Sequence, residues 1–186
     1  MAEVMTGNRR GNGWRLALWP GAGALLLAPA VAMQFTTEVK WDITDFLVMG
    51  ALIAAVGGAI EFLVRRSNSP AYRAGAALTL VTAFLLIWVN LAAGLIGTED
   101  HRANLLYAGV FAILAGGALM SHFRPAGMMR TLVAAAAAQA AIGAAAVLAG
   151  WGMEGQNWPR DVIGANGMFA ALWLASAALF GRAARV

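Results

Sequence analysis

Long apolar stretches alternate with short polar segments along the whole chain, and this pattern predicts a bundle of membrane-spanning helices. Each stretch is about 20 residues long, which is what a helix needs to cross a hydrocarbon layer of ~30 Å. The joining segments are short, so successive helices are expected to be antiparallel neighbours. The fold class predicted is all-α, a polytopic membrane helical bundle with six transmembrane helices. These are Leu16–Phe35, Phe46–Val64, Ala74–Gly97, Leu105–Phe123, Thr131–Gly150 and Val162–Gly181.

Composition agrees with a chain whose solvent is largely lipid. Hydrophobic residues make up 61% of the 186 residues and charged residues 12%, about half of the share in a typical soluble domain. The chain has no cysteine, which excludes disulfides, thiolate metal sites and cysteine nucleophiles. We expect a cytoplasmic N-terminal tail over residues 1–15, one six-helix transmembrane domain over 16–182, and a cytoplasmic C-terminal end over 183–186.

Cationic residues gather on one side of the predicted membrane. Of the 13 lysines and arginines, only Lys40, Arg102 and Arg160 fall on the other side. The positive-inside rule therefore predicts that both termini are cytoplasmic. The net charge of +4 does not indicate nucleic-acid binding, because these residues lie at the ends of apolar stretches and not along one soluble face. The residues that chiefly set this topology are Arg65, Arg66, Arg73, Arg124, Arg130 and Arg182.

Some positions recur at nearly equal intervals. Gly50, Gly109 and Gly167 are 59 and 58 residues apart, and an arginine follows each of them 15 residues later. One interpretation is a threefold repeat of a helical hairpin. The other is that helices of equal length, joined by arginine-containing loops, produce the same spacing without any repeat. Both interpretations stay open.

Five polar side chains in four predicted helices fall at similar depths. Counting 1.5 Å per residue from the cytoplasmic arginines puts Asn90, Tyr107 and Asn166 at about 25 Å, with Asp45 and Asn104 at about 30 Å. We expect them to form a polar layer in the outer third of the bundle, which is a candidate ligand-binding site. The alternative is that Asn90 and Tyr107 only hydrogen-bond to each other across the third and fourth helices.

Two further polar residues lie within predicted spans. Glu61 precedes Arg65 by four residues, so an ion pair along the helix is expected, and a proton-relay role is the alternative. Gln139 lies nine residues after Arg130, at the estimated depth of Thr82, and we expect these two side chains to bond.

An acidic loop lies above the polar layer. Glu99, Asp100 and His101, with Asp42, offer oxygen and nitrogen ligands for a divalent cation. The alternative is that an acidic outer loop simply accompanies the charge asymmetry of the membrane. His122 lies at the opposite face, about 30 Å from His101, so one haem cannot take both as axial ligands. No cofactor is indicated otherwise.

Small residues predict where helices meet. Ala108, Ala112 and Gly116 recur every fourth residue, a spacing that lets two helices approach closely in lipid. The fifth helix, TLVAAAAAQAAIGAAAVLAG, is so poor in large side chains that we expect it in the middle of the bundle or against a partner.

The stretch WVNLAAGLIGTEDHRANLLY, Trp88–Tyr107, with FRPAGMMR after it, resembles small bacterial inner-membrane proteins of unknown function. The resemblance covers about the middle third of the chain. It implies a bacterial plasma-membrane location, and it implies no activity and no functional residue.

Three functions stay open. The small-residue fifth helix and the lack of a catalytic motif favour a non-catalytic membrane subunit, with lipid and other membrane subunits or a second copy as partners. The outer polar layer favours a transporter or channel for a small polar or amphipathic solute that enters from the outer face. A membrane enzyme is the third, with an outer acid–base site drawn from Asp45, Glu99, Asp100, His101 and Tyr107.

Overall fold

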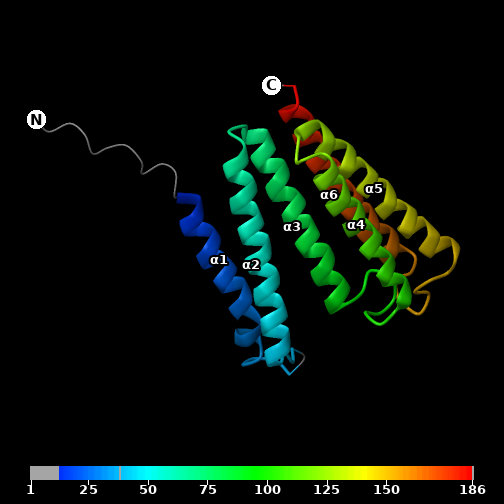
Figure 1. The fold of residues 1–186 in the computed structure, drawn as a ribbon. Coiled ribbons are helices and arrows are strands. Elements are labelled where there is room, and N and C mark those ends of the chain that lie inside the picture. Colours follow the sequence, from blue (N-terminus) through cyan, green and yellow to red (C-terminus); the bar gives the residue numbers. More distant parts are fainter. Residues whose placement is uncertain (1–12, 38, 186) are drawn as a thin grey trace, which may run out of the picture. The chain divides into compact units, whose positions relative to one another are not determined.

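The computed structural model describes residues 13–37 and 39–185, and over this part of the chain it contains helices and no strand (Figure 1). The predicted all-α class is confirmed. The helices in chain order are α1 (Gly13–Ala32), α2 (Ile43–Arg66), α3 (Pro70–Ala92), the 3-10 helix η1 (Arg102–Leu106), α4 (Tyr107–Met120), α5 (Pro125–Leu148) and α6 (Arg160–Ala183).

Five helical segments are long and apolar enough to cross a membrane. In α1, the apolar segment Trp19–Ala32 is shorter than the others, so the first of the six predicted crossings stays a prediction. Of the expected tail, residues 1–12 lie outside the described residues. The five segments are Ile43–Leu63, Pro70–Ala92, Arg102–Met120, Pro125–Leu148 and Arg160–Ala183.

The described chain forms two compact units, one up to Ala59 and one from Ile60 onward. In the first unit, α2 starts with a reciprocal cap. The backbone N–H of Asp42 donates to the Asp45 carboxylate at 2.9 Å, and the N–H of Asp45 donates to the Asp42 carboxylate at 3.0 Å. These bonds satisfy N–H groups at the start of α2, where helical acceptors are lacking. The prediction of a single domain over 16–182 stays a prediction.

In the second unit the packing order differs from the chain order. Helix α6 packs against α5 on one side and α3 on the other, and α5 also packs against α4. Helix α5 lies between α4 and α6 and has the largest buried share of the five spans, as expected for a helix inside the bundle. Its expected alternative place, against a partner, stays a prediction. The expectation of neighbouring successive helices holds for α4–α5 and α5–α6. It is wrong for α3 and α4, because the long connection over residues 93–106 lets α3 pack on α6 instead.

Local sequence signals explain where these helices begin and end. Helix α3 ends at Ala92, before the predicted Gly97, because Gly94 and Gly97 adopt positive φ angles of 71° and 66°. Helix α5 starts at Pro125, six residues before the predicted Thr131. Proline suits the first turn of a helix, where its missing N–H costs nothing.

Glycines allow the closest contacts between helices. A Cβ atom on Gly143 of α5 would lie 2.7 Å from the Cβ of Asn166 on α6, and one on Gly117 of α4 would collide with the side chain of Thr131 on α5. The predicted contact stripe on α4 is wrong within this chain. Ala108 and Ala112 are exposed, and the contact is made by Gly117, which lies on another face of the helix.

Aromatic side chains of α6 fill the core of the second unit. Phe169, Trp173 and Phe180 are buried along one face of α6, together with Leu86 of α3 and Leu132 of α5. At one end of the unit, Phe180 meets Tyr72 of α3 edge to face, with ring centroids 5.1 Å apart.

We expect Gly117→Ala to lower the free energy of unfolding by about 1–3 kcal/mol, because the new methyl group meets the branched side chain of Thr131. Gly116→Ala is the matched control. The space at Gly116 is open, so the same change should be neutral or raise stability by up to about 1 kcal/mol through helix propensity. Unfolding of the detergent-solubilised chain in SDS measures both, and equal effects would contradict the α4–α5 contact.

Candidate functional site

Three buried side chains form a hydrogen-bonded cluster inside the second unit, and we call Tyr107, Gln139 and Asn166 the polar cluster. The Tyr107 hydroxyl donates to Oδ1 of Asn166 at 2.9 Å. Nε2 of Gln139 donates to the same oxygen at 3.0 Å. The exposed fractions of the three are 2%, 0% and 2%, so the cluster is closed to the surroundings.

The helices place these side chains through simple geometry. Tyr107 is the first residue of α4, Gln139 lies in the middle of α5, and Asn166 lies in the second turn of α6. Gly143, one turn after Gln139, lets α6 approach closely enough for Asn166 to reach both partners. Asn166 Nδ2 donates to the Val162 carbonyl in its own helix at 2.9 Å. Each bond between helices is worth about 1 kcal/mol in a membrane.

The structure brings together Tyr107 and Asn166 of the predicted layer, but not Asn90. The Asn90 amide donates to the Leu86 carbonyl of its own helix at 2.7 Å, and its Oδ1 is buried with no partner among the residues that the structure describes. The alternative hydrogen bond between Asn90 and Tyr107 is also not formed, since the Tyr107 hydroxyl donates to Asn166. Depth along a helix does not tell which way a side chain points. The prediction that Asn90 joins the polar layer rests on depth alone, and it is wrong for this reason.

The other two residues of the predicted layer, Asp45 and Asn104, bond to the backbone near them in the chain. Asp45 belongs to the first unit, where it caps α2. Oδ1 of Asn104 accepts from the N–H groups of Leu95 and Ile96 at 3.2 and 3.0 Å, and its Nδ2 donates to the Thr98 carbonyl at 2.8 Å. Asn104 therefore holds the α3–α4 connection in shape, and its amide is fully used by that backbone.

Gln139 belongs to the polar cluster, although the sequence predicts that it lies deeper and bonds to Thr82. Its expected partner, Thr82, donates its hydroxyl to Leu78 of its own helix at 2.7 Å, so that pairing is wrong. The expected depth of Gln139 is counted from Arg130, whereas α5 begins at Pro125. Counted from Pro125, Gln139 lies 14 residues or about 21 Å along the helix, close to the level of Asn166.

The acidic loop does not gather a metal site. Over residues 13–37 and 39–185, no three His, Asp or Glu side chains come close enough together to hold a metal ion. Glu99 and Asp100 are exposed, and Nδ1 of His101 accepts from the N–H of Ala103 at 3.2 Å, which caps η1. An outer acid–base site is not assembled either, because Tyr107 is buried in the polar cluster.

The predicted ion pair on α2 is confirmed. Glu61 accepts from Arg65 at 3.2 Å. The side chain of Arg65 is 68% exposed, so the pair contributes little to stability.

Three buried polar atoms near the cluster have no hydrogen-bond partner among the described residues. They are Gln139 Oε1, Trp173 Nε1 and Ser176 Oγ. Trp173 and Ser176 follow Asn166 by two and about three turns of α6, on its buried face. In contrast, the hydroxyl of buried Thr79 donates to the Gly75 carbonyl at 2.8 Å. Gln139 Oε1 can only accept a hydrogen bond, Trp173 Nε1 can only donate one, and Ser176 Oγ can do both. None of the three is an acid or a base.

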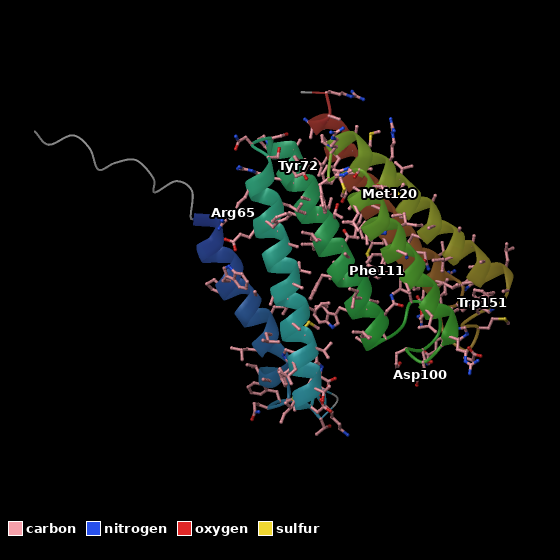
Figure 2. All side chains as sticks on the ribbon, in the orientation of Figure 1. Arg65, Tyr72, Asp100, Phe111, Met120 and Trp151 are labelled. Carbon is pink, nitrogen blue, oxygen red and sulfur yellow. The ribbon has the colours of Figure 1, made fainter. Side chains whose placement is uncertain are left out.

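Arginines mark one end of the second unit. Arg73 lies in the first turn of α3, Arg124 precedes α5, and Arg182 lies in the last turn of α6. Figure 2 shows Tyr72 at this end and Asp100 and Trp151 at the other. We call the end that carries Arg73, Arg124 and Arg182 the arginine end. Arg65 and Arg130 are the other described arginines that were expected to set the topology, and the side chain of Arg66 lies outside the described residues.

No family model, no curated protein and no solved structure matches the chain. The resemblance of Trp88–Tyr107 to small bacterial inner-membrane proteins therefore stays a prediction.

We expect Tyr107→Phe to lower the free energy of unfolding by about 1 kcal/mol, since it removes one hydrogen bond between helices. Asn166→Leu should cost more, because it leaves both the Tyr107 hydroxyl and the Gln139 amide without their acceptor. Equilibrium unfolding in mixed micelles measures both.

Asn90→Leu is the control, because it removes an amide that bonds only within its own helix, and it should be close to neutral. A cost as large as that of Asn166→Leu would show that the polar cluster is not the main polar contact of the bundle.

Proposed function

We propose that the chain is a non-catalytic, membrane-embedded subunit that packs against helices of other membrane subunits or of a second copy. The observation that carries this proposal is a groove of about 460 Å³ along α5 and α6. Its lining includes Val147 and the buried Asn166, and the small residues Ala140, Gly143 and Ala144 of α5 and Gly167 of α6. Such small residues allow close approach of another helix in lipid.

The groove is open where a partner would enter. A Cβ atom on Gly167 would meet no other atom within 4 Å, so space remains above this part of α6. Its mouth carries the larger side chains of Leu148 and Ile163, both exposed. A groove with a small-residue floor and apolar rims suits the side-chain ridge of an apolar helix.

The outer face of α5 supports the same proposal. Ala134, Ala137, Ala141 and Ala144 are exposed along this helix. A helix that meets only lipid normally carries more leucine, isoleucine and phenylalanine. Alanine instead favours contact with another backbone, where dispersion and weak hydrogen bonds replace the hydrophobic effect.

We further propose a bacterial plasma-membrane location with six crossings and both termini in the cytoplasm. The arginine end of the second unit supports this orientation, since Arg73, Arg124 and Arg182 lie there while Arg102 and Arg160 belong to the other end.

A second candidate is transport of a small uncharged solute. Gln139 Oε1, Trp173 Nε1 and Ser176 Oγ favour it, because unpaired polar atoms in a membrane bundle commonly mark a solute path. The side chains of the polar cluster are only 0–2% exposed, so a solute has no open way to them. Transport is therefore the second candidate, after the subunit proposal.

Gly167→Leu should weaken assembly, because the new side chain fills the groove. Gly164→Leu is the matched control. It lies one turn earlier on α6, also has open space around its Cβ position, and does not line the groove. Native mass spectrometry of the gently extracted protein should show partner subunits or a second copy with wild type and with Gly164→Leu, and their loss with Gly167→Leu.

A chain that is monomeric in its wild-type form would contradict the subunit proposal, as would equal assembly of both variants. The chain has no cysteine, so Gly167→Cys adds a second readout. A disulfide between two copies would identify the partner as a second copy.

The orientation has its own test with single cysteines at two exposed positions, Asn68→Cys and Thr98→Cys. On intact cells, a membrane-impermeant maleimide should label Thr98→Cys, and it should label Asn68→Cys only after permeabilisation. The reverse pattern would mean that the arginine end faces outward.

A further inference from the structure

A second cavity opens at the arginine end, away from the groove and the polar cluster. Its volume is about 340 Å³, and it is lined by Ser67, Tyr72, His122, Phe123, Arg124, Pro125 and Ala183. These residues come from the α2–α3 loop, the start of α3, the α4–α5 turn with the first residue of α5, and the end of α6. The cavity is therefore built by four parts of the chain that meet at one end of the helices.

The α4–α5 turn has an unusual backbone that shapes one wall. His122 and Phe123 have φ angles of 50° and 59°, a region that residues other than glycine seldom adopt. The Tyr72 hydroxyl donates to the Phe123 carbonyl at 3.0 Å, which ties this turn to α3. Nε of Arg73 donates to the Ser67 carbonyl at 2.7 Å and holds the opposite loop. Side chains of α3 thus hold both the α4–α5 turn and the α2–α3 loop in place beside the cavity.

The lining favours a negative charge. It includes the Arg124 guanidinium, the His122 ring and the Ser67 hydroxyl as hydrogen-bond donors, and it contains no carboxylate. Arg124 has no ion pair within the described part of the chain, and its side chain does not cap α5. The Arg124 cavity also lies at the N-terminal end of α5, where the helix dipole adds to the positive potential.

We propose that this cavity binds a phosphate group, carried either by the headgroup of an anionic lipid or by a soluble phosphate compound. A guanidinium, a hydroxyl and an imidazole are the usual donors to phosphate oxygens. Phe123, Pro125 and Ala183 form an apolar wall beside these donors, which suits the glycerol and acyl carbons next to a lipid phosphate. Basic pockets between helices at the cytoplasmic face bind lipid headgroups in this way. The proposal does not depend on the subunit function.

The test uses the full chain in detergent and native mass spectrometry. Phosphatidylglycerol and phosphatidylcholine with identical acyl chains are the lipid probes, and inorganic phosphate is the soluble probe. Arg124→Gln should lower the occupancy of the preferred phosphate probe about tenfold, because it removes a charge-assisted hydrogen bond. Arg130→Gln is the matched control, because Arg130 lies six residues after Arg124, is exposed, and is not part of the lining.

A second pair of variants covers the case in which Arg124→Gln does not fold. Ala183→Glu places a carboxylate at the cavity wall and should also reduce binding, whereas Ala184→Glu, exposed and outside the lining, should not. Preference for phosphatidylglycerol without competition by phosphate identifies a lipid headgroup. Competition by phosphate identifies a soluble compound. Equal losses for a lining variant and its control, or no binding of phosphatidylglycerol or of inorganic phosphate, would overturn the proposal.

Discussion

Apolar helices in hydrocarbon gain little from the hydrophobic effect, so close approach of their backbones has to hold such a bundle together. In the second unit these approaches centre on α6. Gly75 of α3 and Gly143 of α5 both face it at distances that leave no ordinary room for a side chain. The other features depend on this arrangement. Asn166 reaches Gln139 only because Gly143 lets the two helices close, and the end of α6 completes the cavity beside Arg124.

Much of the architecture could be predicted from the sequence, because length and apolarity alone define a membrane-spanning helix. Five of the six predicted spans are helices of sufficient length, and their boundaries differ mainly where Gly94 and Pro125 act on the backbone. The pairing of helices could not be predicted in the same way. Short loops favour sequential neighbours, but α3 packs against α6, closely so at Gly75, and the connection after Ala92 is long enough to permit this.

The candidate site was predicted in part, for a related reason. Counting residues from the arginines gives the height of a side chain in the membrane, and on that basis Tyr107 and Asn166 were correctly placed together. Height says nothing about rotation around the helix axis. Asn90 has the right height and turns toward its own backbone, while Gln139 reaches Asn166 from a helix whose start was misjudged. One proline, Pro125, accounts for that second error.

The central place of α6 also bears on how the protein is made. A ribosome releases α3, α4 and α5 into the membrane before α6 has emerged. During that interval α3 lacks the helix against which it finally packs, and the side chains of Tyr107 and Gln139 lack their common acceptor. Until α6 is added, the contacts that these surfaces make with it in the finished structure cannot form. Synthesis thus proceeds in one order and assembly in another, and the earlier helices close around a later one.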